Sequence, residues 1–373
     1  MRSCLSLHAS NIILTPDVER TSVIARAFDT NSTLGPLVKS VELRCQAAPF
    51  IYPLSVHVVG RLSNVQKAIF AALNKHQPFD TSFIRLFVAP CQSLKMMTLA
   101  FIGFPNLSDL VRILWSFPSL ESLMLQHCSW GDSPTDALPD ASLHPGHTSK
   151  LTGLTLWLYH AARPPLSLAP FGTNLTKLDI DPLHSFASTV DYKGLAALEK
   201  LVIFTLRLTK SDIAVAPQAL SHIRSTSLRW LGIAHRVEEQ SPEATVRQLE
   251  TLNPKLADVL ERPTFWDLKG LRWAVHCRVL PAYVAQQKWK RAVTPFVPVM
   301  EDRKLLSVVI EGLASLERLA SLDFVSQALS LSITHRVEDQ TVEETVRPLD
   351  ALNPNLQELL ARPAFWDLRS VSW

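Results

Sequence analysis

The chain has 373 residues, of which 47% are hydrophobic and 19% charged, so it has ample material for a buried core and no disordered signature. A formal net charge of +3, spread over so long a chain, argues against a nucleic-acid-binding surface. No run of about 18 apolar residues occurs, which argues against a membrane-spanning helix.

The cysteines and the first residues indicate a compartment. The five cysteines (Cys4, Cys45, Cys91, Cys128 and Cys277) are widely separated and form no CxxC pair, so we expect buried, reduced thiols. The opening residues MRSCLSLHASNIILTP carry one arginine and a short apolar run broken by polar residues, which is a poor match to a signal peptide. We therefore expect an intracellular protein, cytoplasmic or nuclear.

One apolar pattern, L-x-x-L-x-L with substitutions, recurs along the chain from residue 38. Its copies are VKSVEL from Val38, VQKAIF from Val65, LKMMTL from Leu94, LESLML from Leu120, LTGLTL from Leu151, LTKLDI from Leu175, LEKLVI from Leu198 and LRWLGI from Leu228. Starts at 38, 65, 94, 120, 151, 175, 198 and 228 lie 23 to 31 residues apart. This period is close to the roughly 20–29 residues of leucine-rich repeats.

Each hexad predicts a short strand, because alternate side chains of a strand share a face and the last two apolar positions would then point into one core. One such unit buries too little surface by itself, whereas stacked parallel strands share a continuous core. We therefore predict an α/β fold, a leucine-rich-repeat-like solenoid of short parallel strands with irregular or helical returns. Residues 107–117 and 211–223 are predicted as helical returns, and 129–150 and 160–174 as loops.

The C-terminal end of the array is duplicated. Residues 231–273 and 331–373 share more than half of their positions, and both end on a phrase containing FWD. We predict a solenoid over 1–273, a connecting segment over 274–311 and a shortened duplicate over 312–373. The Asn-Pro pair at 253–254 is expected to divide TVRQLETLNPKLADVL into two short helices.

FWD leads into a further hexad, LKGLRW from Leu268, so a scaffold role is the favoured interpretation. Phe265 and Trp266 would pack before the strand, and the Asp267 carboxylate would accept backbone hydrogen bonds at the turn. The alternative is that Trp266 and Asp267 form a ligand-binding corner.

The sequence offers no recognisable catalytic chemistry. GxGxxG, P-loop, HExxH and GxSxG motifs do not occur, and the 12 histidines are dispersed. We expect no catalytic residue, no cofactor, no metal site and no enzymatic activity.

Repeat solenoids bind partners on the surface that their strands present, so the outward hexad positions are the candidate site. Methionine, tryptophan and mixed charge there suit a protein partner. The candidate partner-binding residues are Met96, Met124, Trp157, Lys177, Asp179, Val202, Trp230 and Arg272. The alternative is that loops or a terminal segment cover some of them.

Two segments resemble a known family. NIILTPDVERTSVIARAFDTNSTLGPLVKSVELR (11–44) and FPNLSDLVRILWSFPSLESLMLQHCSW (104–130) are similar to the region after the F-box in fungal, basidiomycete-type F-box and leucine-rich-repeat-like proteins. The resemblance covers about residues 10 to 230. It implies repeats that recruit a substrate protein to an SCF-type ubiquitin ligase, whose adaptor subunit binds the F-box.

The ten residues before residue 11 leave no room for an F-box, so we expect this chain to lack one and do not expect it to bind the adaptor. The leading hypothesis is a non-enzymatic protein-interaction module that binds an unidentified substrate protein. The alternative hypothesis is a structural or degenerate paralogue with no retained partner.

Overall fold

The structure is a computed structural model, and it describes residues 11–14, 18–45, 57–72, 91–130, 150–158, 166–182, 190–208, 215–237, 242–277 and 306–312. The chain divides into two compact units, Met1–Glu317 and Arg318–Trp373. All described residues belong to the first unit, so the predicted duplicate lies outside them beyond residue 312.

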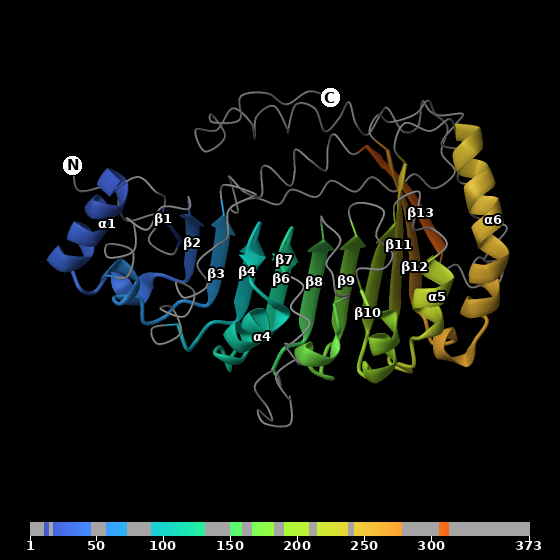
Figure 1. Cartoon of the computed structure of the whole chain (residues 1–373), viewed down its shortest axis with the longest axis horizontal. Helices are drawn as coiled ribbons and strands as arrows, with labels where there is room; N and C mark the ends of the chain where they lie inside the picture. The colour runs from blue at the N-terminus through green and yellow to red at the C-terminus, as the bar shows by residue number, and fades with distance from the viewer. Residues whose placement is uncertain are drawn as a thin grey trace, which may run out of the picture. The chain divides into compact units, whose positions relative to one another are not determined.

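Eleven strands form one parallel sheet in the order β1-β2-β3-β4-β6-β8-β9-β10-β11-β12-β13 (Figure 1). They are β1 (Asn11–Leu14), β2 (Ser40–Cys45), β3 (Lys67–Ala72), β4 (Met96–Ala100), β6 (Ser122–Gln126), β8 (Gly153–Leu158), β9 (Lys177–Pro182), β10 (Ile203–Leu208), β11 (Trp230–Val237), β12 (Gly270–Cys277) and β13 (Leu306–Gly312). Every neighbouring pair in the sheet is parallel. The predicted α/β architecture of stacked parallel strands is confirmed.

The hexads align in register, so their apolar positions form two continuous rows on one face of the sheet. One row is Val41, Ala68, Met97, Leu123, Leu154, Leu178, Phe204, Leu231 and Leu271; the other is Leu43, Phe70, Leu99, Leu125, Leu156, Ile180, Leu206, Ile233 and Trp273. All of these side chains are buried in one core cluster. Full burial of such a side chain contributes about 1.5–3 kcal/mol, so the two rows are the main stabilising element.

Helical segments return the chain between strands and close the same core. Helix α4 (Leu107–Trp115) begins where the Asn106 side chain accepts a hydrogen bond from the Asp109 backbone N–H at 2.7 Å. Helix α5 (Val215–Ser221) forms despite Pro217, as predicted. The short 3₁₀ helices η1 (Gly35–Leu37), η4 (Ala169–Phe171), η5 (Tyr192–Ala197) and η6 (Pro263–Phe265) make tighter returns elsewhere.

The prediction of two short helices around residue 253 is wrong. Helix α6 is continuous over Pro242–Leu260, with Pro254 inside it (Figure 1). Val246, before the proline, packs against the core, and Leu256 and Val259, after it, are buried. Apolar contacts on both sides of Pro254 therefore offset the backbone hydrogen bond that proline cannot donate.

Two strands extend the array beyond the predicted hexads. At one end, β1 pairs with β2, aligning Ile12 with Val41 and Leu14 with Leu43. At the other end, β13 pairs with β12 and aligns Leu306 with Leu271. The interpretation of 274–311 as a connecting segment is thus wrong for residues 306–311, which belong to the sheet.

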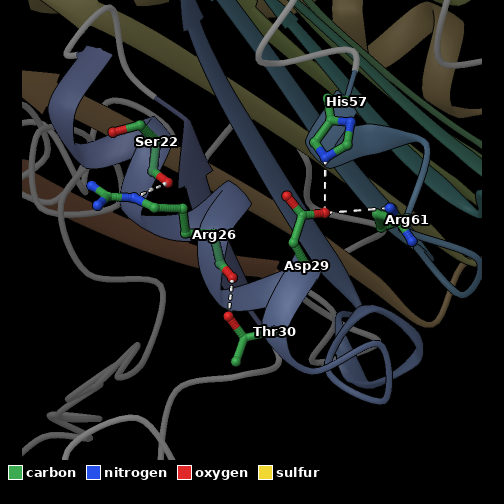
Figure 2. A network of polar contacts seen from close by, with 6 residues as sticks. All are labelled: Ser22, Arg26, Asp29, Thr30, His57 and Arg61. Atoms are coloured by element: carbon green, nitrogen blue, oxygen red, sulfur yellow. Dashed lines mark hydrogen bonds and ion pairs between the residues drawn. The ribbon is translucent and has the colours of Figure 1, made fainter.

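Helix α1 (Val18–Thr30) precedes β2 and buries Ala25 and Phe28. Its C-terminal end is tied to the segment before β3 by polar contacts (Figure 2). The Asp29 carboxylate oxygen Oδ1 lies 3.0 Å from His57 Nε2 and 3.3 Å from Arg61 Nη2. All three side chains are exposed, so these contacts orient the helix while the buried Phe28 contributes most of its anchoring.

Two adjacent repeats contain the same corner after the strand. Phe101 and His127 have φ angles of 58° and 53°, and their rings stack with centroids 4.7 Å apart. The corners lead into a second, two-stranded parallel sheet, β5 (Gly103–Phe104) with β7 (Ser129–Trp130). Between the corner and β7, the buried Cys128 Sγ lies 3.2 Å from the Leu99 carbonyl oxygen. Cys128 and Cys91 are free and buried, as expected.

Candidate partner-binding face

The face of the sheet opposite the core is the candidate site, and we call it the outward face. By register its first row is Ser40, Lys67, Met96, Ser122, Gly153, Lys177, Ile203, Trp230 and Gly270; its second row is Glu42, Ile69, Thr98, Met124, Thr155, Asp179, Thr205, Gly232 and Arg272. The first row lies nearest the N-terminal ends of the strands. Because each position recurs in every strand, side chains from repeats far apart in sequence form one surface.

Seven of the eight candidate residues occupy outward positions. Met96 and Trp230 are large apolar side chains that are 46% and 51% exposed, and Lys177 and Arg272 are also exposed. The others, Met124, Trp157 and Asp179, are half-buried. Their role in binding stays a prediction, but their common face is that of a repeat surface.

The eighth candidate, Val202, was assigned to the wrong register. It precedes β10, whose outward residues are Ile203, Thr205 and Arg207. The true hexad starts at Leu201, because Leu198 and Leu201 are both buried and repeat the L-x-x-L spacing. Leu198 instead ends the preceding turn, where the Leu201 N–H donates to its carbonyl at 3.3 Å.

FWD belongs to a turn that leads into the strand in several repeats. The N–H of Leu268 donates to the Phe265 carbonyl at 3.2 Å, as Leu120 N–H does to Phe117 at 3.1 Å and Leu94 N–H does to Cys91 at 3.0 Å. The first residue of each turn is buried. Phe265 is therefore a core residue at a repeating position, and the scaffold interpretation of it is confirmed.

The other two residues of FWD lie on the surface. The Trp266 indole is 59% exposed and its Nε1 donates to the Glu261 carbonyl at 2.9 Å. The Asp267 carboxylate lies 3.6 Å from Arg229 Nη1, so it forms an ion pair rather than the expected backbone hydrogen bonds. Both side chains thus have local partners that belong to the scaffold.

A cluster of charged and aromatic side chains lies at the centre of the outward face. Arg207 of β10 extends toward β9, with its Nη2 3.2 Å from Asp179 Oδ2 and its Nε 3.8 Å from Asp181 Oδ2. Its guanidinium carbon also lies 5.6 Å from the ring centroid of Trp157 on β8. Three neighbouring strands are therefore linked through one arginine, partly by a cation–π contact.

This cluster is substantially desolvated, because the Asp181 side chain is only 6% exposed and that of Asp179 only 15%. Arg207 offsets the cost of burying two carboxylates. The sequence reasoning selected Trp157 and Asp179 but missed Arg207 and Asp181. Arg207 was missed because its hexad was misplaced, and Asp181 because it directly follows its hexad.

Trp230 lies in a different environment, at the N-terminal end of β11. Gly270 of β12 is its register partner, and a Cβ atom at Gly270 would overlap the indole ring. The ring therefore lies across the backbone of the neighbouring strand. Arg229 and Lys269 flank this position, joined by a hydrogen bond of 2.7 Å from the Lys269 N–H to the Arg229 carbonyl.

Within the described ranges, no group of three or more histidine, cysteine, aspartate or glutamate side chains is arranged to hold a metal ion. None of the helices in those ranges is both long enough and apolar enough to cross a membrane.

The repeat geometry defines the class of fold as a leucine-rich-repeat-like solenoid. No protein-family model and no curated protein matches the chain. Among solved structures, the leucine-rich repeat-containing protein LegL7 from Legionella pneumophila is similar at 13% identity and a TM-score of 0.44, covering 80% of this chain and 90% of its own. A likeness this distant carries no functional argument, so the assignment of the class rests on the strand register and the core rows.

Proposed function

We propose that this chain is a non-enzymatic protein-interaction module that binds a protein partner through the outward face. The observation that carries the proposal is the pair of exposed apolar side chains, Met96 and Trp230, in the first row of that face. Monomeric surfaces carry scattered exposed apolar residues, but two that a repeat array places in one row suit a shared partner.

The spacing of these residues fits one partner. Five strand steps separate β4 from β11, which at about 4.8 Å per step corresponds to roughly 24 Å. A standard protein interface of about 800 Å² per partner spans a comparable distance. Between the two anchors lie Lys177 and the Asp179–Asp181–Arg207 cluster, which offer polar groups for specificity.

The resemblance to F-box receptors supports a finer proposal, namely that the partner is a substrate protein destined for ubiquitination inside the cell. The free, buried thiols of Cys91 and Cys128 are compatible with a reducing compartment. This finer role is tested by the half-life of the captured partner in cells that have or lack the chain. A half-life that does not depend on the chain would argue against a ubiquitination role.

The test of the binding role is photo-crosslinking in cells of the native organism. A photoreactive amino acid replaces Met96 or Lys177 on the outward face, and Arg112 of α4 or Gln218 of α5 serves as the matched exposed control. We expect the two outward positions to capture the same protein and the two helix positions not to capture it. Capture from all four positions, or from the helices alone, would contradict the proposal, and no capture would favour a paralogue without a partner.

A further inference from the structure

The C-terminal end of the outward face contains an aromatic side chain held in one orientation. Trp230 is 51% exposed, yet one side of its ring rests on the backbone at Gly270, where no side chain intervenes. A tryptophan fixed in this way loses little conformational entropy when a partner contacts its open side. Oriented, partly exposed tryptophans are typical centres of binding energy in protein interfaces.

The charges around Trp230 have one predominant sign. Arg229, Lys269 and Arg272 lie before, beside and diagonally across from the indole in the register of β11 and β12. The outward residues Trp230, Gly232, Ala234, Gly270, Arg272 and Ala274 include no acidic side chain. The nearby Asp267 pairs with Arg229 and is 73% exposed, so it neutralises only part of this charge.

The acidic residues of the neighbouring strands do not offset these cations. Asp179 and Asp181 both lie on β9, two strands from β11, and both are engaged by Arg207. The outward face is therefore divided into a central cluster, where charge is internally paired, and a basic end around an exposed indole. We call the residues Arg229, Trp230, Lys269, Gly270 and Arg272 the Trp230 patch.

We propose that the Trp230 patch binds an acidic segment of the protein partner, which places an apolar side chain against the indole and carboxylates against the surrounding cations. This inference rests on the proposed function and adds the chemistry of the partner to it. Charge complementarity selects an acidic segment, because a basic one would meet Lys269 and Arg272 as like charges. A nucleic acid is disfavoured because its affinity depends on many phosphate contacts, whereas this patch contains three cations, one of which already pairs with Asp267.

A displayed library of random peptides, selected on the full chain, tests this chemistry. We expect the selected peptides to be enriched in Asp and Glu around an aromatic or aliphatic residue, and to bind less tightly as the salt concentration rises. Resynthesised peptides with Glu replaced by Gln, or with the apolar residue replaced by Ser, should each bind roughly tenfold more weakly. A duplex DNA and a single-stranded RNA of matched length serve as competitors.

Matched variants locate the binding. Trp230→Ser should weaken the selected peptides by about tenfold or more, and Lys269→Glu should weaken them mainly at low salt. Trp266→Ser is the control, because Trp266 is an equally exposed tryptophan outside the patch, and it should leave affinity unchanged. Circular dichroism and the thermal midpoint verify that each variant is folded.

Gly270→Ala gives an independent variant. Its methyl group would displace the indole, so peptide binding should fall nearly as far as in Trp230→Ser, and the double variant should show no further loss. An additive double variant would contradict the role of Gly270 in orienting Trp230.

Three outcomes would overturn the proposal. Peptides that bind independently of Trp230 but depend on Met96 would contradict the Trp230 patch while leaving the outward face as the binding surface. Competition by nucleic acid that itself depends on Trp230 would replace the protein segment with a different ligand class. Recovery of no peptide that depends on any outward residue would count against the proposed function as well.

Discussion

The two faces of the same strands differ in what their residues can tolerate. On the core side, each strand contributes a fully buried apolar residue to a row shared with its neighbours, so Leu99 contacts the core from β4 while Thr98, one residue away, lies on the outward face. The inward rows are nearly uniform in chemistry, whereas the outward rows vary from strand to strand. The fold is thus encoded on one face, which leaves the other free to encode recognition.

The sharpest way to test this contrast lies within FWD. Phe265→Ala should lower the free energy of unfolding by about 4 kcal/mol, because it removes a fully buried ring at a repeating core position. Asp267→Ala should change it by less than about 0.5 kcal/mol, because the ion pair with Arg229 is exposed. Urea unfolding followed by circular dichroism measures both, and equal effects would refute the scaffold assignment.

A second pair of substitutions applies the contrast to adjacent residues of one strand. Leu99→Ala should cost about 3 kcal/mol, since it leaves a cavity between the β3 and β6 rows. Thr98→Ala should cost less than about 0.5 kcal/mol, as is usual for surface substitutions. Thermal unfolding distinguishes them. A Thr98 variant as destabilised as the Leu99 variant would mean that the outward face is itself part of a core.

The outward face makes one structural contribution of its own, at Arg207. Arg207→Met should destabilise the fold by about 2 kcal/mol, because Asp179 and Asp181 would remain desolvated without their cation. Adding Asp179→Asn and Asp181→Asn should restore part of that loss, since neutral amides need no counter-charge. If the triple variant is no more stable than Arg207→Met, packing rather than charge explains the effect.

Cys128 gives a smaller effect with a defined pH dependence. Burial raises the pKa of its thiol from 9.0 to about 12, so the folded state keeps the proton that the unfolded state releases. This contribution is fully present below about pH 9 and is lost as pH rises toward 12, by about 1.4 kcal/mol per pH unit. Unfolding free energies of wild type and Cys128→Ala should therefore converge or cross as pH increases over that window.

Chemical labelling gives the matching readout for Cys128. At about pH 8 the buried thiol should resist iodoacetamide in the folded protein and react after denaturation, because only the thiolate is nucleophilic. Mass spectrometry reports the modified residue. Rapid labelling of Cys128 under native conditions would contradict its burial next to the Leu99 carbonyl.

The sequence predicted the hexads well where their first position was a large apolar residue. Strands β1 and β13 were missed because the equivalent first positions are Ala9 and Arg303, which break the L-x-x-L-x-L pattern. The slip at Val202 arose because Leu198, Leu201 and Phe204 keep the same spacing through the turn and the strand. Periodicity alone cannot choose between two such registers, whereas pairing with β9 does.

The candidate site was predictable in part for a related reason. Strand alternation by itself is enough to place Met96, Trp230 and Arg272 on one face. The contacts of Arg207 with Asp179, Asp181 and Trp157 depend on the register of three strands, and the seating of Trp230 depends on a glycine forty residues later. Such relations follow from the stacking of repeats, which the spacing of hexads specifies only approximately.

The account rests most directly on the claim that the outward face binds the partner. Isothermal titration of the crosslinked partner against Met96→Asp and Arg112→Asp compares an exposed outward residue with an exposed residue of α4. We predict an affinity at least about tenfold weaker for Met96→Asp and unchanged for Arg112→Asp. Unchanged affinity for Met96→Asp together with a loss for Arg112→Asp would contradict the account and move the binding surface to the helical side.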